Sequence, residues 1–146
     1  IHLSIGAGNL INFLQAQGHT MAAVSGGFVD VLEPLLAEIG ITNYQANKLE
    51  IIDGKLTGKI IGAIVDSKTK SETLVKFANQ FKILMTETVA IGDGANDMEM
   101  LQSAGVGIAF NAKPKLKEIA DIVLDMPNLD AVIYLLGLSN LDVTSN

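Results

Sequence analysis

Cysteine is missing from this chain of 146 residues, and its absence removes several kinds of chemistry. Without cysteine there is no disulfide framework, no thiol nucleophile and no zinc–thiolate site. The absence fits a reducing compartment, so we expect a cytoplasmic protein. Clusters of basic residues are also missing and the net charge is −6. This balance argues against a nucleic-acid footprint and against binding to an anionic membrane surface.

Long apolar runs are lacking too. No uninterrupted run approaches the roughly 18 residues that a membrane span needs, and no signal-peptide pattern occurs. Repeats, low-complexity segments and linkers are absent as well. Apolar side chains nevertheless make up 49% of the chain, which argues against disorder. A chain of this length suits one domain with a sizeable core, so we expect residues 1–146 to form a single domain.

Strand-like and helix-like patterns alternate along the chain. Such alternation predicts an α/β fold with a parallel sheet flanked by helices. The expected strands cover residues 20–24, 88–91, 106–110 and 122–124, and the expected helices cover residues 6–17, 28–39, 67–81, 114–120 and 129–136, with a further helix that begins near Met98.

One segment interrupts this alternation. Residues 49–52 and 55–61 alternate between apolar and polar side chains on either side of Asp53-Gly54. An Asp-Gly pair between two alternating runs is a strong signal for a β-hairpin. We therefore expect a hairpin here, at the rim of the sheet.

The stretch from Val89 to Met98 holds the most informative pattern. A short apolar strand stops at a Gly-Asp-Gly turn, and Asp93, Asn96 and Asp97 gather at the mouth of the following helix. Ligands bind outside the carboxyl ends of strands in open α/β sheets, and a helix start favours anions. Carboxylates in such a place indicate a hard cation shared with a phosphate.

A purely structural interpretation of that turn exists. Asp93 would then be a helix N-cap and Asp97 an acidic residue of the first turn. The glycines on both sides of Asp93 favour the ligand interpretation, because they let the backbone and a ligand approach each other closely. An EF-hand is excluded, since its spacing of acidic residues is absent.

Two further segments add groups suited to a phosphate. Ser25 with Gly26 and Gly27 offers a hydroxyl and unencumbered backbone N–H donors, and Lys70 offers a point charge. Taken singly, Ser25 could be a turn hydroxyl and Lys70 could lie on a solvated helix face. Together with the acidic turn they describe a Mg²⁺-dependent phosphate site, and we expect Ser25, Lys70 and Asp93 to converge around one pocket.

These segments resemble the phosphoserine phosphatases of the haloacid dehalogenase (HAD) superfamily. The resemblance rests on residues 24–28, 47–58, 90–97 and 109–114 together with Lys70, in the order in which the family has them. It implies a Rossmann-like HAD core that, with Mg²⁺, hydrolyses O-phospho-L-serine to L-serine and phosphate, the last step of serine biosynthesis.

The resemblance also implies roles for the phosphate-binding residues. Ser25, with the backbone of Gly26 and Gly27, would bind the oxygens of the transferring phosphoryl group. Lys70 would neutralise that group and the nucleophile. Stabilising the charge of the phosphoryl group is the main task of the protein in such chemistry.

The acidic turn receives its roles in the same way. Asp93 would be the Mg²⁺ ligand. Asn96 would form a hydrogen bond near the phosphoryl group. Asp97 would act indirectly, by orienting Lys70 or a water bound to the metal.

The chain departs from the family in one respect. The family forms an aspartyl-phosphate on the first Asp of an Asp-x-Asp-x-Thr motif and uses the second Asp as general acid and base, and this motif is absent here. The first strand and the cap that grips the serine moiety are absent too. In the family the nucleophile strand lies between the strands that end at Ser25 and Asp93. We therefore expect the nucleophile upstream of this chain, and residues 1–146 alone to be inactive.

The missing strand leaves several possibilities open. A complementing N-terminal segment of the same gene, or a second chain in a homodimer, would take the place of the missing strand between the strands that end at Ser25 and Asp93. A different class of function is a truncated, non-catalytic HAD module that binds Mg²⁺ and phosphate or a protein partner. The phosphorylation domain of a cation pump is disfavoured, because a Ser-Gly-Gly segment stands where a pump has a threonine-containing motif.

Overall fold

The computed structural model describes residues 2–137 of the chain. It divides into two compact units, one built from Ala22–Asp125 and one that combines Ile1–Met21 with Met126–Asn146. All of the candidate site residues lie in the unit Ala22–Asp125. A single domain over the whole chain stays a prediction.

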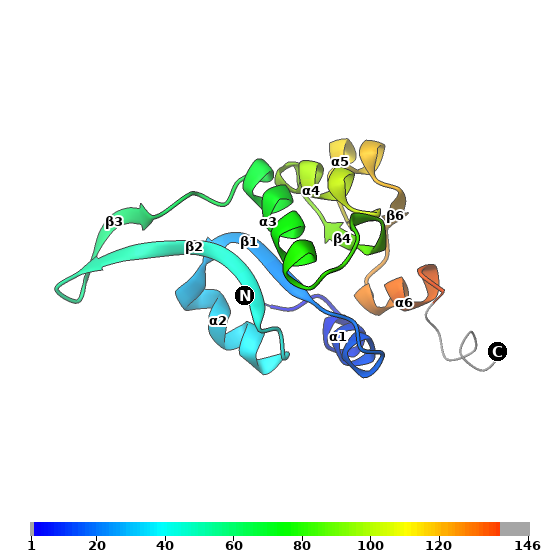
Figure 1. The fold of residues 1–146 in the computed structure, drawn as a ribbon, viewed down its shortest axis with the longest axis horizontal. Helices are drawn as coiled ribbons and strands as arrows, with labels where there is room; N and C mark the ends of the chain where they lie inside the picture. The colour runs from blue at the N-terminus through cyan, green and yellow to red at the C-terminus, as the bar shows by residue number, and fades with distance from the viewer. Residues whose placement is uncertain (1, 138–146) are drawn as a thin grey trace. The chain divides into compact units, whose positions relative to one another are not determined.

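The first sheet of the larger unit has the strand order β1-β2-β3. Strand β1 (Ala22–Phe28) leads into helix α2 (Val29–Glu38), which packs against β1 and β2. Strand β2 (Asn43–Ile52) returns parallel to β1 and then pairs antiparallel with β3 (Lys55–Ile61). The long strand β2 thus joins a parallel pair to a hairpin (Figure 1).

The hairpin turn is built as its sequence predicts. Asp53 and Gly54 both have positive φ angles, 51° and 74°, as a two-residue type I′ turn requires. Figure 1 shows the tip of the β2–β3 hairpin projecting away from the second sheet of the same unit. The predicted hairpin at the rim is therefore confirmed.

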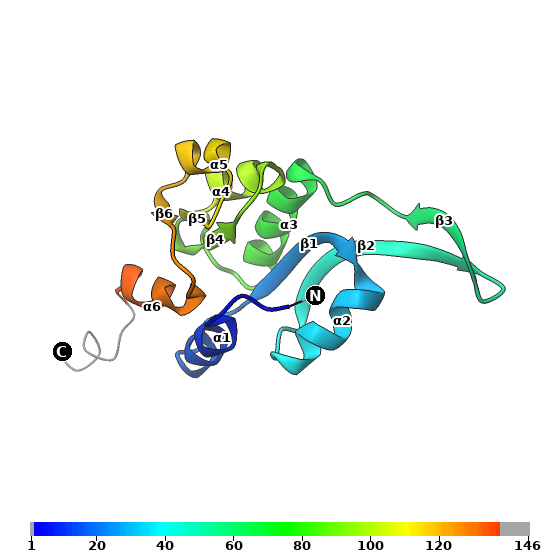
Figure 2. The same cartoon turned by 180° about the vertical axis from the view of Figure 1, so that it is seen from behind.

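The second sheet has the order β4-β5-β6, and all of its strands are parallel. Its strands are β4 (Val89–Gly92), β5 (Val106–Phe110) and β6 (Ile122–Leu124), preceded by the 3₁₀ turn η1 (Met85–Glu87). The 3₁₀ turn η2 (Ala95–Asp97) and helix α4 (Met98–Ser103) connect the first two strands, and α5 (Pro114–Ile119) connects the last two (Figure 2). Pro114 opens α5, a position that suits its fixed φ angle.

A small apolar core lies between the second sheet and its helices. It contains Ala90, Met100, Leu101, Ala109 and Leu116, all buried. The expected α/β architecture, with parallel strands flanked by helices, is therefore confirmed.

Helix α3 (Ser67–Gln80) links the two sheets of the larger unit. It contacts β1 of the first sheet, and it contacts η2 and α4 behind the second sheet. Helix α3 therefore contacts β1, which carries Ser25, and η2, which carries Asn96 and Asp97.

Both sheets end in a strand with one unpaired side. Within residues 2–137, β1 pairs only with β2, and β4 pairs only with β5. Neither strand contains a charged residue or a proline, the devices with which proteins protect true edges.

The smaller unit brings together segments from both halves of the chain. Helix α1 (Ala7–Ala16) contacts the 3₁₀ turn η3 (Leu129–Ala131), which continues into α6 (Val132–Leu135). The backbone N–H of Leu129 donates to the carbonyl of Ile5 at 2.7 Å. Among the described residues, no helix has the length and apolar character needed to cross a membrane.

Candidate active site

The Gly-Asp-Gly turn at the end of β4 is held by hydrogen bonds to the backbone N–H and the carbonyl of Asp93. The Asp97 carboxylate oxygen Oδ2 accepts from the N–H groups of Asp93 and Gly94, at 3.1 and 3.3 Å. The carbonyl of Asp93 accepts from the N–H of Lys113 at 3.0 Å. The backbone of Asp93 is therefore fixed while its side chain is exposed.

Gly92 makes this arrangement possible by leaving room for Asp97. A Cβ atom at position 92 would lie 2.5 Å from the Cβ of Asp97 and 2.6 Å from its Cγ. Real Cβ atoms do not come this close to other heavy atoms. Only glycine therefore lets Asp97 fold back over the end of β4.

The other carboxylate oxygen of Asp97 binds Lys70. The Lys70 ammonium lies 2.7 Å from Asp97 Oδ1, and both side chains are only 7% exposed. Lys70 is therefore not on a solvated helix face. Because a buried charge without its partner is strongly destabilising, this pair holds α3 against the acidic turn.

The start of α3 determines where Lys70 lies. The Asp66 carboxylate caps the helix by accepting from the backbone N–H of Thr69 at 2.8 Å, and this hydrogen bond lowers the pKa of Asp66. The Lys70 N–H donates to the Asp66 carbonyl at 2.9 Å, which closes the first turn. A lowered pKa means that the cap stabilises the protein at neutral pH and that this contribution is lost as acid protonates Asp66.

The Ser25-Gly26-Gly27 segment lies inside β1 and not in a loop after it. The expected strand ends at Val24, but the observed strand continues through Phe28. Between two register pairs with β2, these three residues of β1 face a single residue of β2, so they form a bulge in the ladder. The strand continues beyond the bulge because Phe28 pairs again with β2.

Within this bulge the Ser25 hydroxyl is oriented by a local hydrogen bond. Its oxygen accepts from the Gly27 N–H at 3.0 Å. A hydroxyl that accepts in this way still has its own proton to donate. The bulge therefore leaves a hydroxyl donor at this point of β1.

Asn47 is a buried residue beside the bulge, and the sequence pattern assigned it no role. Its side chain is buried, donates from Nδ2 to the Gly26 carbonyl at 2.8 Å and accepts at Oδ1 from the Val65 N–H at 2.8 Å. Its partners are backbone groups 21 and 18 residues away in the sequence. No local pattern could have indicated such contacts.

The structure thus brings some of the predicted residues together directly. Lys70, Asp97 and the backbone of Asp93 form one contiguous cluster, and the exposed Asn96 lies on η2 beside it. Ser25 is connected to the start of α3 through the hydrogen bonds of Asn47. Convergence of Ser25, Lys70 and Asp93 on one pocket stays a prediction.

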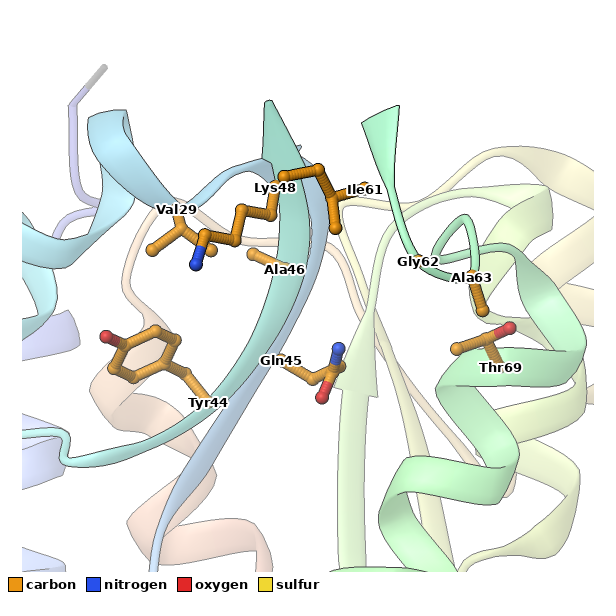
Figure 3. A pocket seen from close by; sticks show the side chains of 9 residues that line it. All are labelled: Val29, Tyr44, Gln45, Ala46, Lys48, Ile61, Gly62, Ala63 and Thr69. Atoms are coloured by element: carbon orange, nitrogen blue, oxygen red, sulfur yellow. The ribbon is translucent and has the colours of Figure 1, made fainter. Parts of the chain in front are cut away.

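A cavity of about 350 Å³ lies along β2. Figure 3 shows Tyr44 and Lys48 of β2, Ile61 of β3 and Thr69 of α3 around it. None of the predicted site residues in the described chain lines it. The Tyr44 hydroxyl donates to Glu33 at 2.7 Å, and this bond raises the pKa of Tyr44.

The acidic turn offers one carboxylate for a metal ion. Over residues 2–137, no three His, Asp or Glu side chains form a metal-binding cluster. The Asp97 carboxylate is engaged with Lys70 and two N–H groups. In the same part of the chain the Asp93 side chain has no hydrogen-bond or ion-pair partner, so its oxygens are available.

A comparison with family models identifies the chain. Residues 28–136 match the model of the haloacid dehalogenase-like hydrolases. The chain belongs to this family. The HAD fold expected from the sequence is thereby confirmed.

This HAD chain is similar to proteins named phosphoserine phosphatases, as its sequence suggests. It is 48% identical over 139 residues to phosphoserine phosphatase SerB2 of Mycobacterium tuberculosis, a match that covers 95% of the chain and 34% of the relative. The chain therefore spans about a third of that protein.

Solved structures agree with this similarity. A phospho-aspartyl intermediate analogue of phosphoserine phosphatase superimposes with a TM-score of 0.86 at 40% identity, over 92% of this chain and 64% of that one. The unliganded probable phosphoserine phosphatase of Vibrio cholerae gives a TM-score of 0.91 at 34% identity, over 100% of this chain and 45% of that one.

Proposed function

We propose that this chain forms the phosphate-binding and metal-binding part of a Mg²⁺-dependent phosphatase that acts on O-phospho-L-serine. The observation that carries the proposal is the buried Lys70–Asp97 pair, fixed beside the available carboxylate of Asp93 at the end of a parallel strand. A fixed cation next to a metal-binding carboxylate suits a phosphoryl group. The names of the relatives support phosphoserine as the substrate.

The residues of this chain would stabilise the transferring phosphoryl group. Ser25 would donate its hydroxyl proton to one phosphoryl oxygen, and the N–H of Gly26 would donate to another. Lys70 would offset the negative charge that builds up as the bond to phosphorus breaks. Asp97, which holds the Lys70 ammonium at 2.7 Å, would keep that charge in one place.

The Mg²⁺ ion that the family implies would bind through Asp93. Mg²⁺ takes oxygen ligands and is commonly held by one or two carboxylates together with substrate phosphate. The exposed carboxylate on a fixed backbone at Asp93 fits that requirement. When bound, the ion would neutralise charge on the phosphoryl oxygens.

The nucleophile would come from a further segment. We propose that a parallel strand carrying the Asp-x-Asp-x-Thr motif pairs with the open sides of β1 and β4, which are apolar and uncharged. An oxygen of its first Asp would attack phosphorus and the bond from phosphorus to the serine oxygen would break. The second Asp would protonate that oxygen, and water would then hydrolyse the aspartyl-phosphate.

The test compares two forms of the protein. We expect residues 1–146 alone to hydrolyse no phosphoserine and to aggregate or unfold readily. The chain preceded by its upstream coding sequence should release phosphate from phosphoserine in a Mg²⁺-dependent way. Turnover by residues 1–146 alone would mean that the nucleophile does not lie upstream of this chain, whereas an inactive longer protein that still binds phosphate would favour the non-catalytic module.

A homodimer and a cytoplasmic location are further parts of the proposal.

A second prediction concerns the metal directly. Mg²⁺ should raise the melting temperature of the longer protein, because a ligand that binds only the folded state stabilises it. Asp93→Asn should remove most of that increase, while Asp53→Asn in the distant hairpin turn should leave it unchanged. An Asp93→Asn protein with the full response to Mg²⁺ would exclude Asp93 as a ligand.

A further inference from the structure

The Asn47 side chain stands out among the buried polar groups of the larger unit. It is 5% exposed and contributes both a donor and an acceptor to backbone groups of two other segments. A side-chain amide is suited to this, because it donates and accepts at the same time. A carboxylate of the same shape could accept from Val65 but could not donate to Gly26.

The contact with Gly26 reaches Ser25 through one peptide group. Asn47 binds the carbonyl of Gly26, and the N–H of the same Gly26–Gly27 peptide donates to Ser25 Oγ at 3.0 Å. A peptide group is planar, so fixing the direction of its carbonyl fixes the direction of its N–H. Asn47 therefore orients the peptide N–H to which the Ser25 hydroxyl is bound.

The contact with Val65 reaches the lysine. Val65 directly precedes Asp66, the residue that caps α3 and closes the turn on which Lys70 lies. The same amide thus binds the segment that carries the hydroxyl and the segment that leads to the cation. Its two hydrogen bonds, each 2.8 Å long, set the spacing between them.

We propose that Asn47 is a positioning residue of the phosphate site, which acts through Ser25 on one side and the start of α3 on the other. This inference rests on the proposed function, because it assigns a purpose to the geometry of the same site. Asn47 does not touch the phosphoryl group in this proposal. A substitution that removes only the hydrogen bond to Gly26 should therefore have an effect that depends on the presence of Ser25.

The test is a titration with inorganic phosphate in the presence of Mg²⁺, followed by NMR at the Gly26 and Gly27 amides of the longer protein. Asn47→Asp loses the donor to Gly26, so we expect phosphate to bind about tenfold more weakly, the usual cost of losing a group that orients a ligand. Asn79→Asp, an equal change of charge at an exposed position of α3, should have no effect. If Asn47→Asp does not fold, Asn47→Ser removes both hydrogen bonds of the amide without adding charge and should also weaken phosphate binding.

A double mutant separates positioning from a general structural role. In a Ser25→Ala background, Asn47→Asp should weaken phosphate binding by less than about twofold, because coupled residues are not additive. Additive losses, or unchanged phosphate binding in Asn47→Asp, would overturn the inference. If the longer protein hydrolyses no phosphoserine, the proposed function fails, but the titration still decides the role of Asn47. Absence of phosphate binding in the unmutated protein would overturn both.

Discussion

Replacing Asp97 by alanine should lower the free energy of unfolding by about 3–5 kcal/mol, because it leaves the Lys70 ammonium buried without its counter-charge. The Lys70 side chain is only 7% exposed, so water can replace little of the lost interaction. The substitution also removes the acceptor for the N–H groups of Asp93 and Gly94. Urea unfolding of the longer protein would measure the change.

Two further variants show whether the loss of stability comes from the buried ion pair. Asp125→Ala breaks the exposed pair between Lys117 and Asp125, whose side chains are 35% and 52% exposed, and should cost less than about 1 kcal/mol. Lys70→Met combined with Asp97→Leu removes both charges and should recover much of the loss, since an apolar pair can replace a buried ion pair. Equal effects of Asp97→Ala and Asp125→Ala would mean that the buried pair does not hold α3 in place.

Gly92→Ala should disable the site although position 92 carries no functional group. The new methyl group would lie 2.5 Å from the Cβ of Asp97, a backbone-anchored atom that cannot rotate away. Overpacking of this kind costs about 1–3 kcal/mol. Asp97 must shift, and Lys70 shifts with it. Misplacing a charge-stabilising group by about 1 Å can lower the rate by roughly 100-fold.

The comparison for this variant is Gly8→Ala. Gly8 lies in α1 with open space where a Cβ atom would be added, so alanine there should be neutral or stabilise the helix. Phosphoserine turnover and urea unfolding should be measured for both proteins. A Gly92→Ala protein with unchanged activity would show that the turn tolerates displacement of Asp97.

Much of the fold was predictable because local signals determine it. The hairpin follows from Asp53-Gly54, whose positive φ angles match the turn that the pair favours. Helix α3 follows from its apolar spacing and ends one residue earlier than expected. Strands 106–110 and 122–124 have the expected bounds, because short apolar runs between turns leave few alternatives.

What local signals could not predict depends on long-range contacts. Most lysines are exposed to solvent. Lys70 can be buried because it pairs with the carboxylate of Asp97, which lies 27 residues further along the chain. The bulge at Ser25 depends on the register with β2, which no stretch of β1 encodes. Strand β2 begins before its apolar part, at Asn43, because pairing with β1 orders its polar residues.

The smaller unit has a consequence for how the chain is made. Asn9 of α1 donates to Asp130 at 3.5 Å across 121 positions of sequence. A helix of 10 residues is marginally stable in water without packing partners. During synthesis on the ribosome, α1 therefore emerges well before Asp130 and must wait until most of the following described chain has been translated before its partner exists. Of the helices that the structure describes, the earliest in the sequence is thus among the last to acquire stable structure.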